Sequence, residues 1–206
     1  AFSLQQVIDR YEKAQNDSRL YKIKDITKQI DSLAARMDRV TVNLSRPMEI
    51  RHAVEAADNE VLYDWSASFV DEIDSILFAG VDGIVLARAP DEFRFGDSLT
   101  GADFFEQALN AGEYVGVTMV DGRLSFVACR TVKKYNDLTV GVVAVVVNIT
   151  PELLNRMAPD EFTMLTAVGP VSAIAGSGAA TPVYESYAIK PVLQGFHAKD
   201  VFRVDM

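Results

Sequence analysis

The sequence predicts an α+β fold with a long N-terminal helix, a five-stranded antiparallel sheet and a smaller second α/β module. Three observations predict it: apolar residues recur at heptad spacing early in the chain, short β-branched runs follow, and a polar loop with a short helix interrupts them. The 206 residues are 49% hydrophobic, which is enough for a folded core. We divide the chain into a helical region over 1–72, a sheet module over 73–150 and a smaller module over 151–206.

The first helix carries a narrow apolar seam whose members are spaced alternately three and four residues apart: Ile23, Ile26, Ile30, Leu33, Met37, Val40 and Leu44. Such a seam packs either on the chain's own domain or on a second copy in a dimer. Its narrowness favours the dimer, because a broad sheet usually takes a wider apolar stripe. Pro47 ends this helix, and apolar spacing predicts a second helix over about Met48 to Val70.

Five strands are expected after Glu72, over residues 73–80, 83–88, 114–120, 123–134 and 138–149. Turns at Asp82-Gly83, Asp121-Gly122 and Asn136-Asp137 separate the members of successive hairpins. A loop over 89–100 and a short helix that ends at Gly112 lie between the second and third strands. This order predicts an antiparallel sheet with its crossover after the second strand.

The smaller module is expected to start with a short helix, with Thr150 as the N-cap and Pro151 in the first turn. Four short strands follow in the prediction, over residues 161–168, 171–176, 183–192 and 200–206. These segments are too short for a generous core of their own.

Composition excludes several classes of function. The net charge of −9 disfavours nucleic acid as a partner. The single cysteine, Cys129, is expected to be a small buried hydrophobic residue, and His52 and His197 lack metal-ligand spacing, so no metal, cofactor or catalytic residue is predicted. No run is long enough for a membrane span. Because the chain opens directly into a helical pattern at Ala1, we expect it to be a segment of a longer protein.

Four motifs, taken in order, resemble one family. These are VDGIVLAR, FRFGDSL, FFEQALNAG and DLTVGVVAVVVNI, and they resemble the Cache family of PAS-like extracytoplasmic sensor domains. The run over 149–176 is similar to the passage into the second module of double-Cache sensors in bacterial histidine kinases and chemoreceptors. The resemblance covers residues 75–175. The last 30 residues are shorter than a complete second module, and the Tyr, Arg, Trp and Asp signature of amino-acid-binding members is absent.

The resemblance implies a membrane-distal PAS-like module over 73–150 and a membrane-proximal one over 151–206. It also implies a periplasmic, non-enzymatic sensor domain of a bacterial inner-membrane receptor, with flanking transmembrane helices outside this chain. We expect a homodimer formed through the N-terminal helix, and a small anionic ligand whose binding is transmitted through that helix. The alternatives are a ligand-free dimerisation module, a module that binds a protein partner, and a small hydrolase that uses Asp82, Asp97 or Asp121.

The expected ligand pocket lies between the sheet and the loop-helix crossover. Its candidate residues are Arg88, Arg94, Phe95, Phe105, Tyr114, Thr118, Phe126 and Arg130. Arginine offers a planar fork that suits carboxylate or phosphate, and Arg130 requires a partner or a ligand within an apolar strand. In the alternative interpretation, Arg88 and Arg94 do not bind a ligand but form local ion pairs with neighbouring acidic residues. The three phenylalanines have an alternative as core residues.

Overall fold

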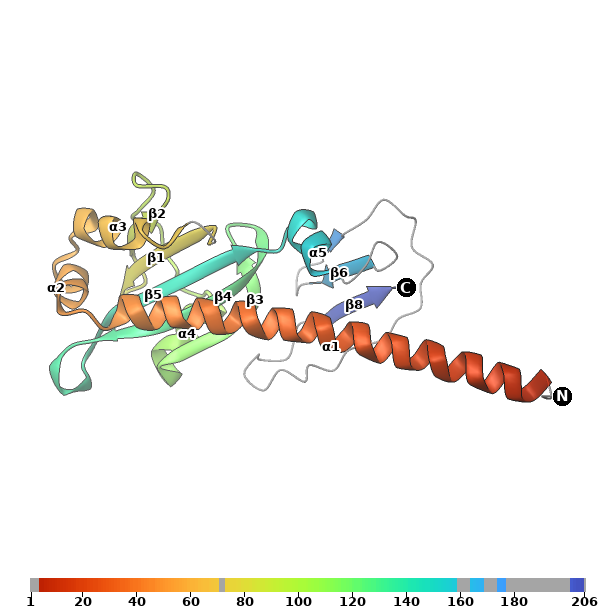
Figure 1. Ribbon diagram of the computed structural model, residues 1–206. Coiled ribbons are helices and arrows are strands. Elements are labelled where there is room, and N and C mark those ends of the chain that lie inside the picture. The colour runs from red at the N-terminus through yellow and green to blue at the C-terminus, as the bar shows by residue number, and fades with distance from the viewer. Residues whose placement is uncertain (1–3, 71–72, 159–163, 169–173, 177–200, 206) are drawn as a thin grey trace.

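The computed structural model describes residues 4–70, 73–158, 164–168, 174–176 and 201–205. The chain begins with the long helix α1 (Leu4–Ser45), followed by two short helices and a five-stranded sheet. In Figure 1, α1 runs along this sheet and continues well beyond it towards the N-terminus. The predicted α+β class is therefore confirmed.

The second predicted helix is in fact two helices, α2 (Met48–Ala56) and α3 (Asn59–Ala67). Ala57 takes the left-handed conformation with φ 52°, which stops α2. The Asp58 carboxylate then accepts a hydrogen bond from the Val61 N–H at 3.3 Å and caps α3. The prediction of one continuous helix was wrong because the apolar spacing runs through this cap without interruption.

The five-stranded sheet has the order β2-β1-β5-β4-β3, and every neighbouring pair is antiparallel. Its strands are β1 (Ser75–Gly80), β2 (Val85–Ala89), β3 (Glu113–Val120), β4 (Arg123–Lys133) and β5 (Thr139–Asn148). Helix α4 (Asp103–Ala111) lies between β2 and β3 in the chain. All five predicted strands and the crossover after the second strand are confirmed.

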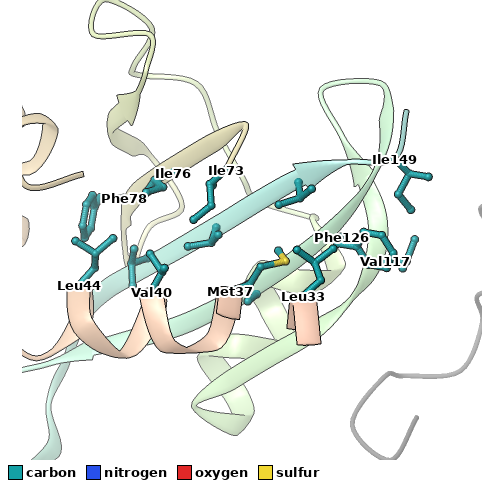
Figure 2. Packing of buried hydrophobic residues seen from close by; sticks show 14 of the residues in the cluster. Leu33, Met37, Val40, Leu44, Ile73, Ile76, Phe78, Val117, Phe126 and Ile149 are labelled. Atoms are coloured by element: carbon teal, nitrogen blue, oxygen red, sulfur yellow. The ribbon is translucent and has the colours of Figure 1, made fainter. Parts of the chain in front are cut away.

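Each face of this sheet has its own hydrophobic core, because side chains alternate along a strand. On the face covered by α1, Phe78 and Phe126 pack with Met37 and Leu44 of the helix (Figure 2). We call this the α1 face. The opposite face, which we call the α4 face, buries Leu77, Val127 and Cys129 of the sheet together with Phe104 and Phe105 of α4.

The heptad seam of α1 packs within the chain. From Ile26 to Leu44 its members are at most 9% exposed and belong to the core of the α1 face. The interpretation of this segment as a dimer seam was therefore wrong. A narrow seam is enough to pack α1 on the sheet, because the helix lies along β4 and β5 and contacts mainly these two strands. Upstream, Leu20 and Tyr21 are exposed.

After the sheet the chain forms α5 (Pro151–Met157), where the Thr150 hydroxyl accepts a hydrogen bond from the Leu153 N–H as predicted. Three short strands follow, β6 (Met164–Val168), β7 (Ile174–Gly176) and β8 (Val201–Asp205), in the antiparallel order β7-β6-β8. They match three of the four predicted strands. The fourth, over 183–192, lies outside the described residues.

Candidate functional site

Arg88 is a buried cation at the edge of the α4 face. It lies on β2 opposite Leu77 of β1, and only 4% of its side chain is exposed. Its Nη2 donates to Asp97 Oδ2 at 2.6 Å and its Nη1 donates to Asp121 Oδ2 at 2.8 Å. Two carboxylates, nine and 33 residues away along the chain, thus compensate the desolvation of one guanidinium.

The loop after β2 positions the first of these carboxylates. Strand β2 is an edge strand of the five-stranded sheet, and the loop folds back along its open side. The Val85 N–H donates to the Asp97 carbonyl and the Gly96 N–H donates to the Val85 carbonyl, both at 2.8 Å. The loop therefore satisfies the exposed backbone of the edge strand and fixes Asp97 beside Arg88.

The turn between β3 and β4 supplies the second carboxylate. Asp121 takes a left-handed conformation with φ 52°, which suits a two-residue hairpin turn with Gly122. Its other oxygen, Oδ1, lies 2.9 Å from Arg94 Nη2. Because β2 and β3 are the two edges of the sheet, Asp121 ties the loop at one edge to the turn at the other.

A cleft of about 290 Å³ lies between these two edges. We call it the Arg88 cleft. Its lining residues are Asp74, Ser75, Arg88, Pro90, Asp91, Arg94, Val120, Asp121, Arg123, Val146 and Asn148. Ser75, Val146 and Asn148 come from the central strands β1 and β5, while the loop and the β3–β4 turn flank them.

The charges in the Arg88 cleft are balanced, since three arginines and three aspartates line it. Within the described part of the chain, three buried polar atoms in or beside it have no hydrogen-bond partner: Ser75 Oγ, Arg88 Nε and Asp97 Oδ1. Buried polar groups in native proteins nearly always have partners, so these atoms indicate a place for water or a polar ligand.

The other predicted site residues on this side of the sheet do not line the Arg88 cleft. Phe105 and Tyr114 are buried in the core of the α4 face. Thr118 is half-buried, and strand alternation places it on the same face as Tyr114. Phe95 lies on the loop with 49% of its surface exposed. The apolar part of the expected pocket is thus largely filled by the chain's own side chains.

Phe126 and Arg130 lie on the α1 face, so the prediction that they share one pocket with Arg88 was wrong. Arg130 Nη2 binds Asp38 Oδ1 of α1 at 2.7 Å and Glu113 Oε2 of β3 at 2.5 Å. Desolvation by itself lowers the pKa of Arg130, but the hydrogen bond and charge of Asp38, together with Glu113, raise that pKa above its ordinary value. The partner that the sequence required for this charge comes from α1.

Sequence reasoning missed several residues of the cleft. Ser75, Arg123 and Asn148 gave no signal, because each lies at the end of a strand whose apolar pattern dominates. Asp121 was noticed as a turn residue and as a candidate for hydrolysis. The structure instead pairs it with Arg88 and Arg94, and it pairs Asp97 with Arg88.

Three other findings concern the described part of the chain. Cys129 is fully buried, and burial raises the pKa of its thiol. Among the described residues, no group of three or more His, Cys, Asp and Glu side chains is placed to hold a metal ion. None of the described helices is both long enough and apolar enough to cross a membrane.

A long helix on one face of a five-stranded antiparallel sheet, with a loop-helix crossover on the other face, defines the Cache type of PAS-like fold. Comparison with solved structures agrees. The sensor domain of the V. cholerae histidine kinase DctB matches with a TM-score of 0.62 and 13% identity, over 81% of this chain and 68% of that one. The ligand-binding domain of the Pseudomonas aeruginosa PAO1 amino acid chemoreceptor PctC, in complex with GABA, has the same TM-score and identity. There the match covers 95% of this chain and 98% of that one.

The ligand-binding domain of the Campylobacter jejuni chemoreceptor Tlp3, in complex with L-norvaline, also has a TM-score of 0.62. It is 12% identical, and the match covers 90% of this chain and 78% of that one. No protein-family model matches the chain, and no curated protein matches it either. The chain therefore has the fold of Cache-type sensor domains, as its motifs predicted.

Proposed function

We propose that this chain is the extracytoplasmic ligand-sensing domain of a bacterial transmembrane receptor of the histidine kinase or chemoreceptor class. The observation that carries the proposal is the Arg88 cleft, where a buried guanidinium and unpartnered buried polar atoms adjoin a cavity about the size of a small molecule. The fold supports it, because the similar structures include a histidine kinase sensor domain and chemoreceptor ligand-binding domains.

The ligand of this cleft is a small molecule that carries a carboxylate together with a positive charge. Arg94 and Arg123 offer guanidinium groups to the carboxylate, while Asp74 and Asp91 balance them and suit an ammonium group. The balanced lining fits such a zwitterion better than the simple anion expected from the sequence. GABA and L-norvaline, which are bound in two of the similar structures, belong to this chemical class.

Signal transmission through α1 is part of the same proposal. A ligand that binds one arrangement of the cleft better than another shifts the population towards that arrangement. Helix α1 packs on β4 and β5, whose opposite faces support the α4 side of the sheet. In this view 73–150 is the membrane-distal module and 151–206 the membrane-proximal one, and the transmembrane helices and the output domain lie outside this chain. If two copies pair through α1, they do so upstream of Ile26, where Leu20 and Tyr21 are exposed.

A second candidate function is a sensor module without a small ligand, which dimerises or binds a protein partner. The observation in its favour is that Phe104, Phe105 and Tyr114 fill the apolar part of the α4 face. The part of the expected pocket that stays open is the polar Arg88 cleft. Its volume of about 290 Å³ is at the lower end of the range for small-molecule sites.

A thermal-shift screen against amino acids, GABA, dicarboxylates and polyamines tests the two candidates. A ligand at a hundred times its dissociation constant adds about 2.7 kcal/mol to the stability of the folded protein. For a true ligand we expect a dose-dependent rise that Arg123→Gln and Asp91→Asn each reduce, and that Arg39→Gln, an exposed substitution on α1, leaves unchanged. No rise with any compound would favour the ligand-free module.

A further inference from the structure

A second cleft, unlike the first in charge, lies at the end of the sheet where α1 turns into α2. Its volume is about 550 Å³. It is lined by Ser45, Arg46, Arg51, Ala111, Gly112, Glu113, Arg130, Thr131, Lys133, Lys134 and Asp137, none of which lines the Arg88 cleft. We call it the basic cleft.

The basic cleft concentrates positive charge in an acidic protein. Five basic side chains line it against two acidic ones, while the whole chain carries a net charge of −9. A concave surface that gathers charge of one sign focuses the electrostatic field and attracts ions of the opposite sign. The excess of basic side chains in this cleft therefore favours the binding of an anion.

Two of the five cations are already neutralised within the protein. Lys134 Nζ binds both carboxylate oxygens of Glu55 at 2.7 Å, and Arg130 binds Asp38 and Glu113. The other three cations are Arg46, Arg51 and Lys133. Among the residues that the structure describes, neither Arg46 nor Arg51 makes an ion pair, and the nearest carboxylate oxygen to Lys133 is that of Asp137, at 3.9 Å.

Hydrogen-bond donors in the basic cleft are also unsatisfied. The Nε atoms of Arg51 and Arg130 are both buried, and neither has a hydrogen-bond partner in the described part of the chain. The Gly112 carbonyl, a backbone acceptor in the lining, already has hydrogen-bond donors of its own. It accepts from the N–H and from the hydroxyl of Thr131, at 3.0 and 3.1 Å. A buried donor without an acceptor is unfavourable, so an acceptor brought by a ligand would be stabilised here.

We propose that the basic cleft is a second binding site, which takes a small anion bearing a carboxylate or phosphate group. Arg46 and Arg51 are its main ligands, and Lys133 adds a third positive charge. Guanidinium groups match the planar oxygens of carboxylate and phosphate, and the volume lies within the range of small-molecule sites. This site is independent of the Arg88 cleft and of the function proposed for it.

The test is a titration of the isotope-labelled chain followed by amide NMR spectra, with inorganic phosphate and succinate as separate probes. Ionic strength is held constant by exchange with sodium chloride, because exposed charges are screened by salt. We expect saturable shifts in residues 45–51, 111–113 and 130–137 for at least one probe, and comparison of the two separates phosphate from carboxylate recognition.

Matched variants localise the binding. Arg46→Gln combined with Arg51→Gln should weaken the affinity at least about tenfold, since each hydrogen bond to a charged group contributes substantially. Arg39→Gln should leave the affinity unchanged, because Arg39 is exposed on α1 and does not line the basic cleft. Amide spectra of each variant show whether it is folded. If the double variant unfolds, Arg46→Gln with Lys133→Gln replaces it, with the same expected loss.

Three results would overturn the proposal. The first is the absence of saturable shifts with either probe. The second is shifts confined to the surroundings of Arg88 and Asp121, which would assign the anion to the Arg88 cleft. The third is an equal loss of affinity in the Arg39→Gln variant, which would indicate general electrostatic attraction without a defined site.

Discussion

Asp38 of α1 and Arg130 of β4 form an ion pair that joins the long helix to the sheet, with 2.7 Å between Oδ1 and Nη2. Glu113, from the neighbouring edge strand, completes a cluster of three charges around the same guanidinium. The cluster lies beside the hydrophobic seam of α1. It therefore fixes the position of the helix along the strand, where apolar contacts alone discriminate weakly between neighbouring registers.

Asp38→Asn should destabilise the fold modestly. The amide keeps the shape of the side chain but loses its charge, which leaves the half-buried Arg130 with Glu113 alone. We expect a loss of about 1 kcal/mol and a melting temperature about 2–4 °C lower, measured by circular dichroism. Asp31→Asn, at an exposed position on the same helix, is the control. Equal effects of the two substitutions would show that the ion pair contributes nothing specific.

Met37→Ala should destabilise the chain strongly and independently of protein concentration. Met37 is 1% exposed within the core between α1 and the sheet, and truncation of such a residue costs about 2–5 kcal/mol. Urea unfolding of the wild type and the variant, at low and high protein concentration, measures the difference. A difference that grows with concentration would mean that the seam packs against a second copy and not against the sheet of its own chain.

Asp121→Asn should release the loop after β2. Asparagine tolerates the left-handed turn conformation, so the hairpin is kept, while the pairing with Arg88 and Arg94 loses its charge. We expect trypsin to cleave after Arg94 several-fold faster than in the wild type, followed by mass spectrometry. Asp137→Asn is the matched control, because Asp137 also has a positive φ but lies in the β4–β5 turn. An unchanged rate would argue against the role of Asp121 in holding the loop.

Cys129 should be inert in the folded protein. The thiolate is the reactive form of cysteine, and burial raises the pKa of this thiol, so that both access and ionisation oppose reaction near neutral pH. With a thiol-specific chromogenic reagent at pH 8, we expect negligible reaction of the native chain and one thiol per chain in guanidinium. Native reaction at the rate of a free cysteine would contradict the position of Cys129 in the core of the α4 face.

The Arg88 cleft was only partly predictable. Its loop, two of its three arginines and the turn at Asp121 were visible in the sequence, because glycine and charged residues interrupt otherwise apolar strands. The partners were not visible, since Asp121 is 33 residues from Arg88 in the chain and meets it only where the two edges of the sheet approach each other. Ser75 and Asn148 enter the cleft through strand register, which local sequence patterns do not encode.

By itself the sequence determined the strand order along the chain, the turns of the sheet and the α+β fold, because periodicity, caps and turn residues act over a few neighbours. It missed the break between α2 and α3. Only the tertiary structure decided which helix covers each face of the sheet, and so which core each side chain joins. In β4 both faces of the strand are mostly apolar. Strand alternation places Phe126 and Arg130 on one face and Val127 and Cys129 on the other. It does not determine which of these two faces α1 covers. The same holds for the seam of α1, whose spacing suits a second helix as well as a strip of sheet. In both cases the choice depends on contacts between residues far apart in the chain, which form only when the whole domain packs.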